Sequence, residues 1–190
     1  MPKKKIFNIG SQDKKSKILS EIYEWVGLIS FVLVIFTLLF SFVFREVGVQ
    51  GNSMNNTLYY GDRLIIRSIF YSPQKDDIVV IYVKKLHKTI VKRVIAVGGQ
   101  TVNIDYTAHR VYVDGVLQNE PFISQPTAFM GELPVKMPVK VPKDCIFVMG
   151  DNRNYSKDSR SMAIGMIDIR NVLGKVIFRY FPLSNMKIIN

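Results

Sequence analysis

The sequence predicts a mainly β protein, in which one N-terminal transmembrane helix is followed by an all-β extracytoplasmic domain of coiled antiparallel sheets. Two observations carry this prediction. Residues 25–44 form a run of twenty uncharged, largely apolar residues. The rest of the chain consists of short stretches rich in β-branched and aromatic residues, separated by Gly, Pro, Asn and Asp, which is typical of strands joined by turns.

The apolar run is long enough to cross a membrane. Twenty residues in a helix span about 30 Å, which matches the hydrocarbon core of a bilayer. A cleaved secretory signal has a shorter apolar core of roughly 7–15 residues and a small-x-small site after it, and no such site follows Phe44. We therefore expect a permanent anchor over residues 21–44, in a helix that begins near Leu19.

The charges around the run predict its orientation. Six lysines precede it, and only Arg45 follows it before Arg63. Because loops on the cytoplasmic side carry the excess of basic residues, the N-terminus is expected in the cytoplasm. The predicted organisation is a disordered basic cytoplasmic tail over residues 1–20, the span, and an extracytoplasmic domain over residues 45–190. The chain is thus expected in the plasma membrane as a single-pass protein.

The composition and charge distribution indicate which kinds of binding partner to expect. Of the net charge of +11, residues 1–44 contribute +3 (six lysines minus three acids), which leaves +8 on the outer domain. Anionic lipid headgroups are the nearest partner for this charge, so phospholipids are expected and nucleic acid is not. The acidic residues lack the spacing of a calcium loop, so no metal or cofactor is expected. The single cysteine, Cys145, excludes an internal disulfide and fits a buried strand position.

The outer domain is expected to consist of short strands. The candidates are residues 46–50, 63–68, 78–83, 89–97, 101–105, 110–113, 145–149 and 172–181. Asp114-Gly115 predicts a hairpin turn, with residues 116–118 returning. An insertion is expected over about residues 104–142, and its proline-rich stretch 119–142 is interpreted as irregular, outside the core sheet. Ile69-Phe70-Tyr71 is either a loop that dips into the membrane interface or ordinary core packing.

Two residues offer nucleophilic chemistry. Ser53 lies nine residues past the apolar run, after Gly51, whose flexibility allows a tight bend. Lys92 lies in an alternating strand pattern, where it and Arg93 each place a cation on an apolar face. A desolvated lysine loses its proton readily and can act as a general base, whereas arginine must find an anion. The alternatives are a solvated loop serine and an edge-strand lysine that extends to water.

A third segment, residues 150–160, is dense in hydrogen-bonding side chains. The charges of Asp151, Arg153, Asp158 and Arg160 are expected to cross-pair into a rigid scaffold. Ser156 or Ser159 is in a position to orient the lysine amine. The alternative is a charged surface loop.

Together these blocks resemble the type I signal peptidases. The residues that carry the resemblance are Ser53-Met54, Gly61-Asp62, Lys92-Arg93-Val94-Ile95, Gly150-Asp151-Asn152-Arg153, Ser156, Asp158, Ser159 and Arg160, in the family's order. With one N-terminal span, the chain resembles the single-span form typical of Gram-positive bacteria, and the resemblance covers nearly all of residues 25–182.

The resemblance implies a serine–lysine endopeptidase that cuts exported preproteins after a small-x-small motif. We also expect the protein to work as a monomer and without a cofactor. Ser53 would be the nucleophile and Lys92 the general base. Ser156 would hold the lysine amine, with Asp158 and Arg160 as a supporting ion pair. Met54 would line the small substrate pockets and shield the lysine, and the Ser53 N–H would donate to the oxyanion.

Four departures from the family pattern mark a divergent member: Gly51 offers no hydroxyl, Asn56 replaces a proline, Arg67 replaces a lysine, and Gly98-Gly99-Gln100 replaces Pro-Gly-Asp. They leave open whether the substrates are the general secretome or dedicated pilus or surface proteins. Two rival interpretations remain. One is a catalytically silent relative that acts as a membrane-tethered chaperone or assembly factor. The other is a self-cleaving serine–lysine regulator of the repressor type, but such proteins are soluble and carry a DNA-binding module, and neither property is expected for this sequence.

Overall fold

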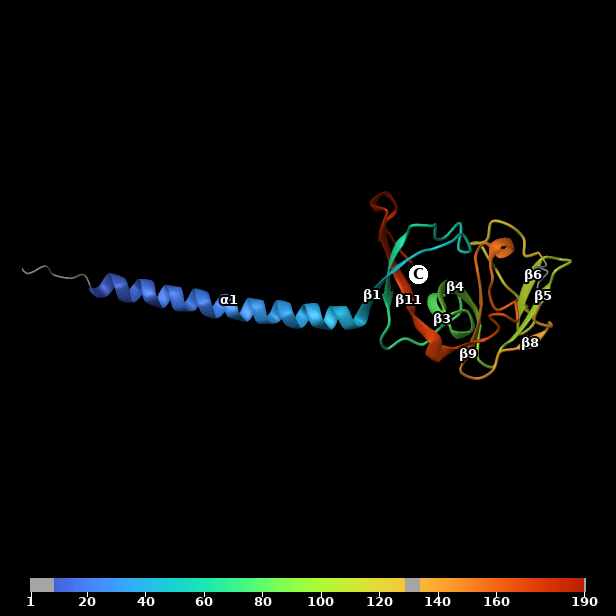
Figure 1. Cartoon of the computed structure of the whole chain (residues 1–190), viewed down its shortest axis with the longest axis horizontal. Helices are drawn as coiled ribbons and strands as arrows, with labels where there is room; N and C mark the ends of the chain where they lie inside the picture. Colours follow the sequence, from blue (N-terminus) through green and yellow to red (C-terminus); the bar gives the residue numbers. More distant parts are fainter. Residues whose placement is uncertain (1–8, 129–133, 190) are drawn as a thin grey trace, which may run out of the picture. The chain divides into compact units, whose positions relative to one another are not determined.

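The computed structural model describes residues 9–128 and 134–189. It divides into two compact units, residues 1–42 and 43–190. The first described element is helix α1 (Ile9–Val43), which forms most of the N-terminal unit (Figure 1). Within α1, the stretch Lys17–Leu38 has a mean hydropathy of 1.9 and is long enough to cross a membrane. Apolar side chains along it, such as Phe31 and Phe36, are exposed.

The helix is longer than the sequence pattern predicts. It begins at Ile9 rather than near Leu19, so residues 9–20 of the expected disordered tail are helical, and it ends at Val43. A helix that has already formed in the apolar run gains one hydrogen bond for each residue added, and Lys and Gln are good helix formers. Residues 1–8 of the predicted tail lie outside the described residues.

The second unit is built on an antiparallel sheet with the strand order β1-β2-β11-β3-β4-β9-β10, and β12 pairs with β11. Its long strands are β3 (Ile78–Val83), β4 (Lys88–Val97) and β11 (Val172–Phe181). The shorter ones are β1 (Phe44–Gly48), β2 (Arg63–Arg67), β9 (Cys145–Met149), β10 (Ile167–Asp168) and β12 (Lys187–Ile188). Short 3₁₀ turns at Lys84–Leu86, Arg153–Tyr155, Ile169–Asn171 and Leu183–Asn185 connect these strands.

A second sheet has the order β7-β6-β5-β8. It contains β5 (Thr101–Asp105), β6 (Arg110–Val113), β7 (Val116–Leu117) and β8 (Val139–Lys140). Figure 1 shows β5, β6 and β8 grouped at one side of the domain, away from β1 and β11. The predicted hairpin at Asp114-Gly115 is confirmed, because Val113 pairs with Val116.

The predicted strands agree closely with the observed ones; β3, β5, β6, β9 and β11 have the expected bounds. The expectation that the whole stretch 119–142 lies outside the sheets is wrong at its end, where Val139 and Lys140 pair with β5. Val141 is fully buried there. The two sheets share an apolar core in which Ile95 and Phe147 pack with β5 and β6, so the insertion is partly core structure. Residues 129–133 of this predicted insertion lie outside the described part.

Candidate active site

Ser53 lies in a turn that follows β1 and precedes β2. Gly51 has φ +100°, a left-handed conformation that glycine adopts without steric cost, as the sequence pattern predicts. The turn after the serine is closed by two hydrogen bonds, from the N–H groups of Thr57 and Leu58 to the carbonyl of Met54. Asn56 has φ +73° within it, a conformation closed to proline and tolerated by asparagine. The departure at Asn56 therefore fits the local backbone.

Lys92 reaches the serine from β4. Its Nζ lies 2.5 Å from the Ser53 Oγ and donates to the Val91 carbonyl at 2.9 Å. The lysine is only 3% exposed. The interpretation of Lys92 as an edge residue extending to water is therefore wrong, and the two residues singled out from the sequence meet in space.

Burial changes the chemistry of this lysine. Loss of solvation lowers the Lys92 pKa to about 8, because burial penalises the charged amine. The carboxylates of Asp158 and Asp151 oppose the decrease, and the positive charge of Arg160 adds to it. A large fraction of the amine is therefore neutral at a mildly alkaline pH, which is the form that accepts a proton.

The segment that follows β9 holds the backbone of the serine. The Asn152 N–H donates to the Ser53 carbonyl at 3.0 Å, and the Asn152 side chain donates to the Asn52 carbonyl at 3.0 Å. Gly150 packs so closely that an added Cβ would lie 2.4 Å from the Ser53 carbonyl oxygen and 2.3 Å from the Ser156 Oγ. Only glycine fits this approach, so the interpretation of the segment as a surface loop is wrong.

The ion pairs of this segment are partly those expected. Arg160 donates two hydrogen bonds to the Asp158 carboxylate, at 2.8 and 2.9 Å, in a buried pair. Burial alone would raise the Asp158 pKa, but the Arg160 charge and several hydrogen bonds to the carboxylate lower it overall. Arg160 also donates to the Arg153 carbonyl at 2.6 Å, so this pair braces the segment from within.

The expectation that all four charges of the segment pair with one another is wrong for Asp151 and Arg153. The Asp151 carboxylate accepts two hydrogen bonds from Arg93, at 2.8 and 2.7 Å. Arg153 instead donates to both carboxylate oxygens of Glu120, at 2.8 and 2.6 Å. Asp151 and Arg153 therefore each find a partner outside the segment, whereas Asp158 and Arg160 pair within it.

Ser156 does not contact Lys92 by a hydrogen bond in this structure. Its hydroxyl is buried against Gly150, and its Oγ has no hydrogen-bond partner of ordinary geometry within the described part of the chain. It lies close enough to Asp158 to help lower the pKa of that carboxyl. Ser159 faces the strand instead, because its Oγ accepts from the Val148 N–H at 3.0 Å.

Four residues of the site were not identified from the sequence. Thr57 donates to Asp151 at 2.5 Å, which ties the turn after Ser53 to the polar segment. Glu120 holds Arg153, and Thr127 accepts from the same guanidinium at 3.0 Å. The Phe122 ring lies 4.0 Å from the Arg93 guanidinium. The expectation that Arg93 binds an anion is confirmed by its pair with Asp151. Nothing in the local pattern of residues 119–127, however, indicates that this stretch packs against the two arginines of the site.

A groove of about 530 Å³ begins at the serine. It is lined on one side by residues 47–51, 53 and 54 and on the other by residues 87–92. Met54, at 1% exposure, forms part of its wall and of the apolar core beneath. Four antiparallel pairings separate β1 from β4, so the two strands run in the same direction. The groove therefore leads from Ser53 and Lys92 back toward Val47 and His87.

A β domain that places a serine hydroxyl beside a buried lysine amine has the arrangement of a serine–lysine hydrolase. Sequence comparisons with known proteins agree with this class. Residues 22–181 match the family described as signal peptidase, peptidase S26. The signal peptidase I of Bacillus licheniformis is 33% identical over 185 residues, covering 93% of this chain and 98% of that protein. Signal peptidase IB of Staphylococcus aureus is 34% identical over 183 residues, covering 88% and 93%. A crystal structure of a signal peptidase I from Enterococcus faecalis aligns with a TM-score of 0.46 and 26% identity, over 55% of this chain and 97% of that one.

The chain belongs to the signal peptidase I family. It is a serine endopeptidase that removes signal peptides from preproteins, with a single N-terminal membrane anchor and an extracytoplasmic domain.

Proposed function

We propose that Ser53 is the nucleophile and Lys92 the general base of this signal peptidase. The observation that carries the proposal is the 2.5 Å separation between the Lys92 Nζ and the Ser53 Oγ. The neutral amine accepts the Ser53 proton as the Oγ attacks the scissile carbonyl, and it then returns that proton to the leaving amine. Water, deprotonated by the same amine, hydrolyses the acyl-enzyme and releases Ser53.

The surrounding residues have positioning roles in this proposal. Arg93 and Asp151 fix the strand that carries Lys92 relative to the turn that carries Ser53, through the Thr57 contact. Asp158 and Arg160 brace the segment that packs on the serine carbonyl. Ser156 lies beside the serine with a free hydroxyl acceptor, so it orients the amine once the Ser53 proton has moved. The Ser53 N–H donates to the oxyanion, as the family resemblance implies.

The groove binds the residues that precede the cleaved bond. Residues 88–92 of β4 pair with β3 on one edge only, since β9 pairs with β4 from Arg93 onward. An extended peptide can add to this open edge by main-chain hydrogen bonds. Apolar walls from Met54, Val49 and Ile90 leave room for small side chains next to the nucleophile, which agrees with a small-x-small motif. Because one chain supplies all of these groups, we infer that the enzyme works as a monomer.

The test uses purified full-length protein, as wild type and as Ser53→Ala, with preproteins from the same organism. We expect the wild type to release mature proteins whose N-termini follow a small-x-small sequence, and Ser53→Ala to release none. A panel that includes pilus and surface proteins distinguishes a general from a dedicated enzyme. Cleavage by Ser53→Ala would contradict the assignment of the nucleophile. If that variant restores the cellular task in a deletion strain, the silent-relative interpretation holds instead.

A further inference from the structure

A buried arginine outside the polar segment contacts the turn that carries Ser53. Arg179 belongs to β11 and is 7% exposed. The pairing of β11 with β2 shifts register between Val176 and Phe178, and a β-bulge of this kind reverses which side chains of a strand face the core. Arg179 is therefore paired with Leu64, on the buried face of β2, where an unbroken ladder would place Phe178. The bulge thus aims a cation toward the apolar core.

The guanidinium of Arg179 joins three parts of the chain. Its Nη1 donates to the Asp62 carboxylate at 2.9 Å and to the Thr57 carbonyl at 3.1 Å. Its Nε donates to the Asn185 carbonyl at 2.8 Å. Figure 1 shows the chain folding back after β11, and β12 pairs with that strand. Arg179 therefore links the loop around Ser53 to the segment that follows β11.

The carboxylate partner of Arg179 closes the loop that carries the serine. The Val49 N–H donates to the Asp62 carbonyl at 2.8 Å, and the Gly61 N–H donates to the Val49 carbonyl at 3.0 Å. The Asp62 carboxylate also accepts from the Tyr59 N–H at 2.9 Å. Residues between Val49 and Asp62 thus form a closed loop, and the buried ion pair lies at its base.

Thr57 connects this ion pair to the catalytic turn. Its hydroxyl donates to Asp151, and its carbonyl accepts from Arg179, so it is held from two sides. Its N–H donates to the Met54 carbonyl, which closes the turn directly after Ser53. A shift of the guanidinium would therefore move the serine hydroxyl away from the amine that activates it.

The physical cost of the pair indicates what it supplies. Taking two charges out of water costs about as much free energy as their attraction returns, so apolar residues of similar volume are often equally stable in a core. Apolar residues cannot, however, offer a donor to the Thr57 carbonyl or an acceptor to the Tyr59 N–H. The pair thus fixes the position of backbone groups, which stability alone does not require.

We propose that Arg179 is a positioning residue of the active site, which holds Ser53 in place against Lys92 through Asp62 and Thr57. Because its Nε is bound by the Asn185 carbonyl, the segment that follows β11 is part of the same support. The proposal rests on the assignment of Ser53 as the nucleophile.

The test exchanges the ion pair for apolar residues in the purified full-length protein. Asp62→Leu/Arg179→Met keeps the approximate volume of the pair, and such exchanges retain or raise stability. We expect the denaturant midpoint to stay at or above that of the wild type, while kcat per folded enzyme falls at least about tenfold and KM changes by less than about twofold. The pH profile should keep its midpoint, because the charged groups that act on the Lys92 amine are not among the changed residues.

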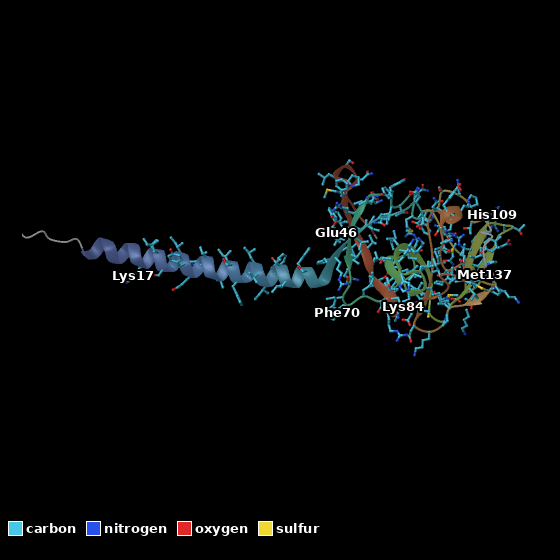
Figure 2. The ribbon with its side chains drawn as sticks, viewed as in Figure 1. Lys17, Glu46, Phe70, Lys84, His109 and Met137 are labelled. Carbon is cyan, nitrogen blue, oxygen red and sulfur yellow. The ribbon has the colours of Figure 1, made fainter. Side chains whose placement is uncertain are left out.

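A conservative variant tests the geometry without changing the charge. Arg179→Lys can still pair with Asp62, but an ammonium cannot place its N–H groups as the planar guanidinium does. We expect kcat to fall severalfold with KM unchanged. The matched control is Arg63→Lys, at an exposed arginine whose partner Glu46 lies at the edge of the domain in Figure 2, and it should cleave like the wild type.

The outcomes separate this proposal from the one on which it rests. Wild-type kcat in the folded double variant would overturn the role of Arg179 and leave the pair a purely structural element. If the double variant does not fold, wild-type kcat in Arg179→Lys overturns the role in the same way. Ser53→Ala is assayed in parallel: cleavage by it contradicts the nucleophile, whereas an inactive Ser53→Ala beside fully active Arg179 variants contradicts only the positioning role.

Discussion

The α-carbon of Gly150 packs against the carbonyl group of Ser53, in a space where a Cβ would approach that oxygen to 2.4 Å. Asn152, two residues further on, donates to the same carbonyl. The segment that follows β9 is therefore fitted to the backbone of the proposed nucleophile, and its fit fixes where the serine hydroxyl meets Lys92.

Gly150→Ala should disable the enzyme while leaving the outer fold in place. The methyl group would overlap both the Ser53 carbonyl and the Ser156 hydroxyl, and overpacking of this kind costs about 1–3 kcal/mol. We expect the free energy of unfolding to fall by about that amount and kcat to fall at least about 100-fold, because a misplacement of about 1 Å has that effect on catalysis. Denaturant unfolding and cleavage assays measure the two effects. Gly48→Ala, where no atom lies within 4 Å of the added Cβ, should leave stability unchanged.

The rate should depend on the protonation of Lys92. Its pKa of about 8 means that the amine is protonated, and unable to accept a proton, below that pH. We expect kcat/KM to rise about tenfold per pH unit below the pKa and to level off above it. The measurement is a series of initial rates against pH with one preprotein. A profile that is flat between about pH 6 and about pH 9, in enzyme that remains folded throughout, would mean that Lys92 is not the base.

Asp158→Asn should shift this profile toward lower pH. The Asp158 carboxylate is the strongest charge that holds the Lys92 pKa up, and its loss also leaves the positive Arg160 unbalanced. Both changes disfavour the protonated amine, so the pKa of Lys92 should fall below about 8. The profile is compared with that of the wild type, after circular dichroism has shown that the variant is folded. A shift to higher pH would show that the Asp158 charge does not act on Lys92.

Glu120→Gln should destabilise the domain strongly. Glu120 is the carboxylate partner of Arg153, whose side chain is fully buried, and an arginine left without its anion in the interior costs about 3–5 kcal/mol. Thermal unfolding in detergent measures the loss. The matched variant is Glu46→Gln, which breaks an exposed pair with Arg63 and should leave the unfolding midpoint unchanged. Equal midpoints for the two variants would contradict the structural role of Glu120.

The strands and the serine–lysine pair could be predicted because their signals are local. Short runs rich in β-branched and aromatic residues define β3, β4 and β11, and a lysine inside the apolar pattern of β4 requires a chemical explanation. The polar segment after β9 is also continuous in sequence, so its role beside the serine was accessible.

The partners of the buried charges were not predictable in the same way. Arg153 pairs with Glu120, and Arg93 packs on Phe122, across loops whose path is set by the tertiary structure. The proline-rich composition of residues 119–142 indicates irregular backbone but not that it covers the site. The start of α1 was placed too late, because propagation from the apolar run extends the helix through polar residues.

The central claim is that a neutral lysine at position 92 takes the proton of Ser53. Its most direct test is the rate of preprotein cleavage by Lys92→Arg, which keeps a positive charge of similar reach but cannot deprotonate. We expect the rate to fall by at least about 10³-fold at every pH, as for the loss of a catalytic base, while Lys140→Arg cleaves normally. Retained cleavage by Lys92→Arg, with N-terminal sequencing showing the authentic mature end, would contradict the account.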